Sequence, residues 1–232
     1  MGNKLIIYHG STKVIEKPIL GYGNPKNDYG LGFYCTQSIE LAKEWACTEE
    51  ENGYANKYNF DIDGLTVLDL SDGNYNILNW LAILLENRYF RINSDIAVRA
   101  KEYILSNFLP SYKNYDVIKG YRADDSYFSF ASAFINSSIS LSQLEKAMML
   151  GNLGEQIVMK SELAFSRLAF LESDFAQKSI YYPKKLARDT SARKAYKSER
   201  SKAPAEDSVY VLDIIRERWQ NDDSRIQRIL LG

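Results

Sequence analysis

Two short apolar segments, separated by a loop dense in glycine and proline, constrain the fold more than any other feature of the chain. Leu5 to His9 is an apolar run that ends at Gly10, which predicts a buried strand entering a turn. Residues 16–31 are rich in glycine, proline, asparagine and aspartate, and they predict a loop. Gly32 to Thr36 predicts a second short strand. A long loop is therefore expected between two buried strands.

The rest of the chain alternates between helical and extended patterns. Ser38 is the expected N-cap of a helix through Cys47, and Asp63-Gly64 predicts a hairpin between strands 57–62 and 65–70. Further helices are predicted at 77–85, 96–108 and 126–136, and another begins at the capping-box patterns of Ser140 and Ser142 and ends at Gly151. Strands are predicted at 117–121 and 155–160. A periodic segment follows at 164–170, and an apolar element at 209–215. Strands at both ends with helices between them predict an α+β fold.

Composition divides the chain into two expected parts. Residues 1–183 are expected to form the main domain, with a helical insertion at about 74–112, followed by a basic segment and C-terminal element at 184–232. Eight lysines and arginines lie between Pro183 and Pro204. This segment is either a solvated helix or tail, or a surface for an acidic partner or a nucleic acid.

Charge, cysteine and histidine counts exclude several classes of function. The formal net charge is -1, so the overall field does not favour nucleic acid. The two cysteines, Cys35 and Cys47, show neither disulfide-framework nor zinc spacing, and a single histidine argues against a histidine-based metal centre. We expect no metal site. The first residues hold too short an apolar run for a signal peptide, and no membrane-spanning run is present, which predicts a cytoplasmic protein.

Two side chains near the loop are candidates for ligand contact. His9 ends the first strand; it is either a partly buried histidine bonded to a carbonyl, or part of a ligand site at the turn. In the second strand Phe33 and Cys35 point one way, so Tyr34 points the other way beside Gly32, with room for a flat ligand. The alternative for Tyr34 is ordinary cross-strand packing.

These residues carry a family resemblance. A strand ending in Tyr8-His9-Gly10-Ser11, then a loop, then Gly-x-Gly-Phe-Tyr-x-Thr from Gly30 and a helix, resembles the ADP-ribosyltransferase superfamily. The closer match is its diphtheria-toxin and poly(ADP-ribose) polymerase branch, which has a His-Tyr-Glu triad. Most of the chain also resembles an uncharacterised bacterial family of that superfamily. The resemblance implies a split antiparallel β-sheet core with a helical insertion.

The resemblance also implies roles for individual residues in binding NAD. His9 would bond the hydroxyls of the adenosine-side ribose, and the backbone of Gly10 would hold the nicotinamide carboxamide through paired hydrogen bonds. Ser11 would be a further residue of this NAD pocket. Tyr34 and, eleven positions later, Trp45 would form the aromatic walls of the nicotinamide site. Ala42 stands where the branch commonly has a serine that bonds the carboxamide. Asp28 and Tyr29, at the end of a loop that would cover the NAD, are further candidates for ligand contact.

The third triad position has two candidates, Glu155 and Gln156. The branch often reads Glu-x-Ile-Val, which favours Glu155, whereas the bacterial family has a recurrent glutamine at the position of Gln156. Apolar residues lie on both faces of this strand, so alternation does not decide. A carboxylate would stabilise the positive charge that develops on the ribose, and a glutamine would do so much less.

The expected function is that of an NAD-dependent mono-ADP-ribosyltransferase, in the setting of a bacterial toxin or phage-defence effector. The partners implied are NAD, a protein or nucleic-acid acceptor, and an antitoxin or regulatory partner. The alternatives are an NAD glycohydrolase and a catalytically silent NAD-binding module.

Asp124 and Asp125 either cap a helix or line the acceptor side of the cleft.

Overall fold

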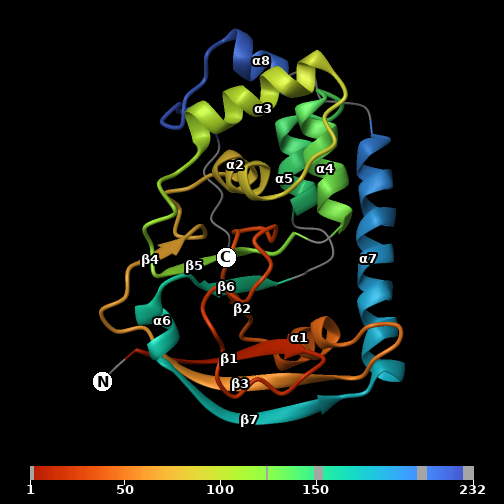
Figure 1. The fold of residues 1–232 in the computed structure, drawn as a ribbon. Helices are drawn as coiled ribbons and strands as arrows, with labels where there is room; N and C mark the ends of the chain where they lie inside the picture. The colour runs from red at the N-terminus through yellow and green to blue at the C-terminus, as the bar shows by residue number, and fades with distance from the viewer. Residues whose placement is uncertain (1–2, 124, 149–153, 203–207, 227–232) are drawn as a thin grey trace.

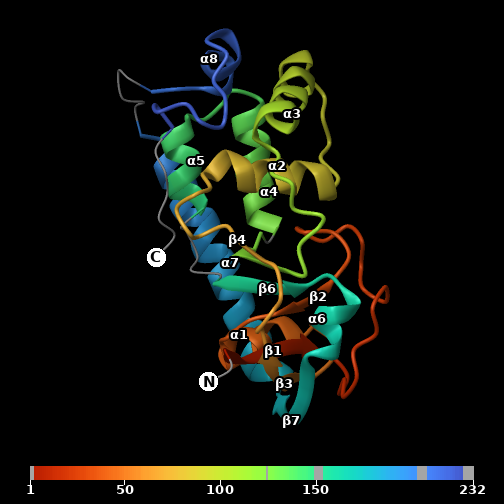
Figure 2. The same cartoon turned by 90° about the vertical axis from the view of Figure 1, so that its left-hand side faces the viewer.

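The computed structural model describes residues 3–123, 125–148, 154–202 and 208–226. They form an α+β fold of two sheets and a helical layer (Figures 1 and 2). Within these ranges, none of the helices combines the length and apolar character that a membrane span requires.

The first sheet is antiparallel and has the strand order β1-β3-β7, formed by Lys4–Ser11, Gly53–Asp61 and Leu168–Ala176. The second sheet has the order β2-β6-β5-β4, formed by Phe33–Cys35, Glu155–Met159, Val117–Tyr121 and Val67–Asp69. Only the β4–β5 pair is parallel in this sheet. The strands expected at 5–9, 32–36, 117–121 and 155–160 are therefore confirmed, with ends that differ by no more than two residues.

A bridge between Tyr8 and Thr36 joins the two sheets. The Tyr8 N–H donates to the Thr36 carbonyl at 2.7 Å, and the Thr36 N–H donates to the Tyr8 carbonyl at 2.9 Å. Beyond this bridge β1 continues along β3 and β2 along β6, so the sheets separate.

The hairpin expected around Asp63-Gly64 is wrong. Gly64 does make a turn, with φ of +76°. The strand after it, β4, joins β5 in the second sheet instead of pairing with β3. Asp63-Gly64 indicates only a local turn and does not determine which strand β4 pairs with. Pairing with β5 buries Leu68 against the helical layer.

Two cores lie on opposite faces of the second sheet. Between the sheets, Ile7, Tyr58 and Phe60 of the first pack near Phe33, Cys35, Val117, Ile157 and Met159 of the second. On the other face, Leu68, Ile118 and Val158 join the larger core with α2 (Ile77–Asn87), α3 (Asp95–Phe108), α4 (Asp125–Ile135), α5 (Leu141–Met148) and α8 (Val211–Arg216). The segment expected as a helical insertion thus shares one core with this sheet.

Side-chain caps set where several helices begin, much as the sequence predicts. The Ser38 hydroxyl accepts from the Leu41 N–H at the start of α1 (Ile39–Ala46). Ser140 and Gln143 cap α5 reciprocally, which confirms the first of the two capping-box predictions. Ser142 lies inside α5. The predicted end of that helix at Gly151 lies outside the described residues.

The basic segment belongs to one long helix, α7 (Lys178–Arg200), in which residue 183, the expected domain boundary, is an internal position. A short helix, α6 (Glu162–Ser166), connects β6 to β7. Figure 1 shows α7 running beside the molecule from α1 and the first sheet to α4 and α5, and it contacts all three of these helices. Helix α7 therefore connects the region of α1 and the first sheet to the helical layer.

Candidate functional site

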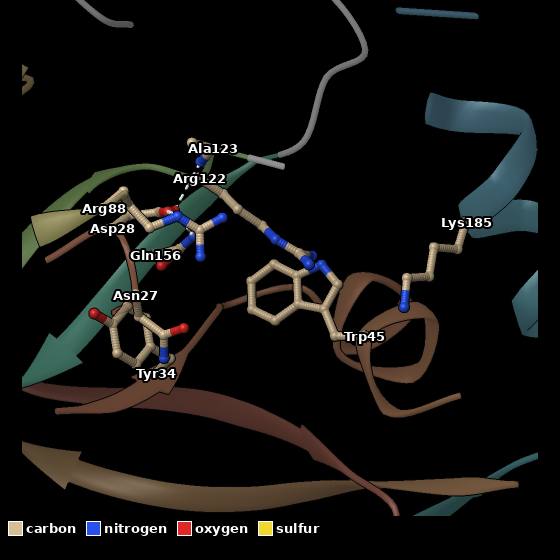
Figure 3. Close-up of a pocket in the computed structure, with 9 residues that line it drawn as sticks. All are labelled: Asn27, Asp28, Tyr34, Trp45, Arg88, Arg122, Ala123, Gln156 and Lys185. Carbon is tan, nitrogen blue, oxygen red and sulfur yellow. Dashed lines mark hydrogen bonds and ion pairs between the residues drawn. The ribbon is translucent and has the colours of Figure 1, made fainter. Parts of the chain in front are cut away.

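The candidate site is a cleft of about 340 Å³ beside the helical face of β2 and β6. Residues far apart in the sequence line it: two on the loop before β2, and others on β2, α1, the end of α2, the segment after β5, β6 and α7 (Figure 3). They are Asn27, Asp28, Tyr34, Trp45, Arg88, Arg122, Ala123, Gln156 and Lys185.

Tyr34 lines the cleft from the face of its strand that alternation predicts. Its ring lies on the face of β2 opposite Phe33 and Cys35, which are buried between the sheets. Its hydroxyl donates to the Gly30 carbonyl at 2.5 Å and accepts from the Tyr29 N–H at 3.1 Å. Burial raises the pKa of the Tyr34 hydroxyl well above its usual range. The hydroxyl therefore anchors the end of the loop and stays protonated.

Trp45 lies across the cleft from Tyr34 (Figure 3). The Arg122 guanidinium carbon lies 4.3 Å from the centroid of the indole ring, in a cation–π contact. Helix α1 carries Trp45 close to β1 because position 10 is a glycine. A Cβ at Gly10 would come within 2.2 Å of the Ala42 carbonyl oxygen and 2.9 Å of the Ala46 nitrogen.

A second cavity, of about 260 Å³, adjoins the first and shares Asn27 and Tyr34 with it. Its lining includes His9, Phe33, Phe165 and the loop residues Ile15, Pro18, Ile19, Gly21, Tyr22, Gly23 and Asn24. The long loop thus covers a hollow that opens beside the main cleft. The mixture of apolar side chains and amides suits a flat, polar ring.

His9 is held in one orientation at the base of this second cavity. Its Nδ1 lies 2.7 Å from the Tyr34 carbonyl oxygen, and its ring stacks on Phe33 with centroids 4.2 Å apart. A carbonyl only accepts, so Nδ1 carries the proton. Burial lowers the pKa of the imidazole, which leaves Nε2 as a hydrogen-bond acceptor at neutral pH.

Gln156, and not Glu155, faces the cleft. Tyr34 is paired with Val158 across the β2–β6 ladder, so Gln156, two positions before Val158, shares the face of Tyr34. Gln156 is 4 % exposed, and its Nε2 donates to Asp28 Oδ2 at 3.1 Å. Asp28 is the one carboxylate among the described residues that line the cleft.

Glu155 lies on the opposite face of β6. It forms an ion pair with Lys119 at 3.3 Å and accepts from the Ser71 hydroxyl at 3.3 Å. A separate hollow, which it lines with Ser38 and Leu41, includes neither Tyr34 nor Trp45. The residue favoured for the third triad position is thus outside the cleft, and its competitor is inside.

Three other predicted ligand contacts lie outside both cavities. Tyr29 is 1 % exposed in the helical core, where it donates to the Tyr121 carbonyl at 2.7 Å. Ser11 ends β1, and its hydroxyl accepts from the Lys13 N–H. Gly10 lines neither cavity; alternation along β1 turns its N–H and C=O to the same edge as those of Tyr8, away from β3. Asp124 and the Asp125 side chain lie outside the described part of the chain.

The basic segment contributes to the site through α7. Arg188 makes two hydrogen bonds to the Glu44 carboxylate, both of 2.9 Å, and Lys184 pairs with Glu40 at 3.0 Å. These contacts hold α7 against α1, next to Trp45. Lys185 of the same helix reaches the cleft lining. Two of the charges expected to face solvent or an acidic partner, Lys184 and Arg188, are therefore paired with acidic residues of α1.

Sequence reasoning missed the cations of the cleft, Arg88, Arg122 and Lys185, because each follows or lies within an element whose position depends on distant contacts. The only local signal is the place of Arg122 at the end of a predicted strand. Nor do the described His, Cys, Asp and Glu side chains gather in any group of three or more that could hold a metal ion.

A comparison with protein-family models finds one described as "Protein of unknown function (DUF3990)", which matches residues 5–170. No curated protein and no solved structure matches the chain. Of the described residues that line the cleft, the matched range contains all but Lys185, which lies on α7 beyond it.

Proposed function

The chain belongs to the DUF3990 family, whose description assigns no function, and from the cleft itself we propose that it is an NAD-dependent mono-ADP-ribosyltransferase. The observation that carries the proposal is the grouping of Tyr34, Trp45 and Gln156 in one cleft, with His9 in the adjoining cavity. These are the residues, distant in sequence, to which the family resemblance assigns NAD contacts. The two sheets, separated beyond the Tyr8–Thr36 bridge, support the ADP-ribosyltransferase fold as their finer description.

In this proposal the adenosine half of NAD lies under the long loop and the nicotinamide half lies between Tyr34 and Trp45. His9 Nε2 accepts a hydrogen bond from a ribose hydroxyl. The bond between nicotinamide and ribose breaks, nicotinamide leaves with the bonding electron pair, and an acceptor nucleophile bonds to the ribose carbon and releases a proton. Residues of the cleft exclude water and orient the ribose.

A second candidate, an NAD-binding module without turnover, is favoured by one observation. The side chain from β6 that faces the cleft is a neutral glutamine, whereas Glu155 is engaged by Lys119 on the other face. A neutral amide gives the developing ribose cation less electrostatic help than a carboxylate. Slow transfer is therefore expected even under the first proposal.

The experiment uses the full chain, NAD labelled in the adenosine half, and a bacterial lysate as the source of acceptors. Nicotinamide release and label transfer are measured for wild type, for His9→Ala and for the surface variant Tyr89→Ala, a control because Tyr89 is 82 % exposed. We expect transfer by wild type and Tyr89→Ala, and a loss of at least tenfold in His9→Ala. NAD binding without nicotinamide release would support the module, and no NAD binding would overturn both.

A further inference from the structure

Asp28 is surrounded by donors at the inner end of the cleft. Its Oδ2 accepts from the Ala123 N–H at 2.9 Å and from the Gln156 amide at 3.1 Å, and its Oδ1 lies 3.4 Å from Arg88 Nε. The residue is only 5 % exposed. Its carboxylate is thus engaged by protein partners, and two of them, Gln156 and Arg88, are side chains that line the cleft.

The Gln156 amide is satisfied on one side only. Its nitrogen donates to Asp28, while its oxygen is buried and has no donor among the described residues. Figure 3 shows this oxygen on the side of the amide away from Asp28, toward Tyr34 and Asn27. A buried carbonyl without a donor costs about 1–3 kcal/mol, so native proteins rarely keep one without a reason.

Rotation of the amide cannot remove this cost. Turning Gln156 by half a turn would bring its carbonyl oxygen against the Asp28 carboxylate, and two acceptors would then face each other. Asp28 therefore decides which end of the Gln156 amide faces the cleft. An ionised carboxylate is acceptor-only, so it selects the nitrogen every time.

We propose that Asp28 is a positioning residue that fixes the Gln156 carbonyl oxygen as an acceptor for a hydroxyl group of the bound ligand. The proposal rests on the proposed NAD cleft and adds the residue that orients Gln156, the side chain at the third triad position. Asp28, predicted as a direct ligand contact, then acts through Gln156. The Gln156 carbonyl oxygen then accepts from a neutral hydrogen-bond donor of the ligand, such as a ribose hydroxyl.

Calorimetric titration with NAD tests whether Asp28 acts through Gln156. Asp28→Ala and Gln156→Ala should each weaken binding tenfold or more, while the double variant should bind within about threefold of Gln156→Ala alone. Losses that multiply in the double variant would overturn the proposal, because Asp28 would then contribute independently. Asp28→Asn, whose amide oxygen can still accept from Gln156, should recover most of the affinity.

The hydroxyl is tested with an NAD analogue that lacks the 2′-hydroxyl of the nicotinamide-side ribose. Wild type should bind it at least tenfold more weakly than NAD, and Gln156→Ala should bind the two equally. Discrimination that persists unchanged in Gln156→Ala would overturn the assignment of the acceptor.

A measurement without ligand separates this proposal from the proposed function. The Gln156 side-chain amide signal is assigned by NMR through its absence in Gln156→Ala. In wild type and Asp28→Asn its protons should be shifted downfield and protected from exchange, and in Asp28→Ala both properties should be lost. A failure to bind NAD would overturn the proposed function alone, whereas an amide signal that Asp28→Ala leaves unchanged would overturn the positioning role.

Discussion

Tyr34 and Val158 face each other across the β2–β6 ladder, and this pairing decides which residues share the cleft. Because side chains alternate along a strand, Gln156 lies on the Tyr34 face and Glu155 on the other. A register shifted by one residue would exchange them. The chemistry available to the cleft is therefore set by a backbone pairing between segments more than a hundred residues apart.

The Tyr34 ring and its hydroxyl have separable roles. The hydroxyl is occupied by Gly30 and Tyr29, and its pKa is raised, so it does not exchange protons in the cleft. We expect Tyr34→Phe to keep NAD affinity within a few-fold and to lower the free energy of unfolding by about 1–3 kcal/mol. Tyr34→Ala, which removes the ring, should lose NAD binding. Equal losses of affinity in the two variants would show that the hydroxyl contacts the ligand.

His9, the chain's single histidine, should titrate below its ordinary pKa of 6.5 because burial disfavours the charged ring. In the unfolded chain the ring takes up its proton near pH 6.5. Stability is therefore full above that pH and falls as the pH drops through 6.5 toward the lower folded pKa, by at most about 1.4 kcal/mol per pH unit. Urea unfolding of His9→Gln should lack this slope, and NMR of the ring reports the pKa directly. A pKa above 6.5 would contradict the buried neutral ring.

Gly10 allows α1 to lie against β1. A Cβ at Gly10 would meet the backbone of Ala42 and Ala46, so Gly10→Ala should displace α1 and cost about 1–3 kcal/mol or more. Gly64→Ala serves as the comparison, because nothing lies within 4 Å of its Cβ and only its positive φ is strained, at about 1–2 kcal/mol. Thermal unfolding should show the larger loss for Gly10→Ala, together with weaker NAD binding through Trp45. NAD affinity unchanged in Gly10→Ala would separate α1 from the site.

The Arg188–Glu44 pair should be the strongest single link between α7 and α1. The Glu44 side chain is 4 % exposed, so Arg188→Ala leaves a buried carboxylate without its partner and should cost about 2–4 kcal/mol. Lys184→Ala is the matched control, because the Lys184–Glu40 pair is about half exposed on both sides and should cost less than about 1 kcal/mol. Urea unfolding compares the two variants. A cost for Arg188→Ala no larger than that of the control would mean that α7 is held by its other contacts.

Local patterns predicted most of the elements, because strand alternation and helix caps are encoded within a few residues. The strand at Leu5–His9 and the Ser38 and Ser140 caps are examples. Local patterns could not predict the pairing of β4, the strand after Gly64, because its partner β5 lies about 50 residues later in the sequence.

The site was predicted in part. The side of β2 taken by Tyr34 followed from alternation, but alternation alone left Glu155 and Gln156 undecided, because apolar residues lie on both faces of β6. Tyr29 looked like a loop residue, although the Trp80 and Tyr121 contacts draw it into the core. The sequence gives no sign that Lys184 and Arg188 of α7 are paired, because their acidic partners, Glu40 and Glu44, lie about 140 residues earlier.

NAD binding in the Tyr34–Trp45 cleft is tested most directly by calorimetric titration of NAD into wild type, Trp45→Ala and Glu155→Ala. Trp45 lines the cleft, whereas Glu155 lies on the opposite face of β6. We therefore expect binding by wild type, binding at least tenfold weaker in Trp45→Ala, and unchanged binding in Glu155→Ala. NAD affinity lost in Glu155→Ala and kept in Trp45→Ala would contradict NAD binding in this cleft.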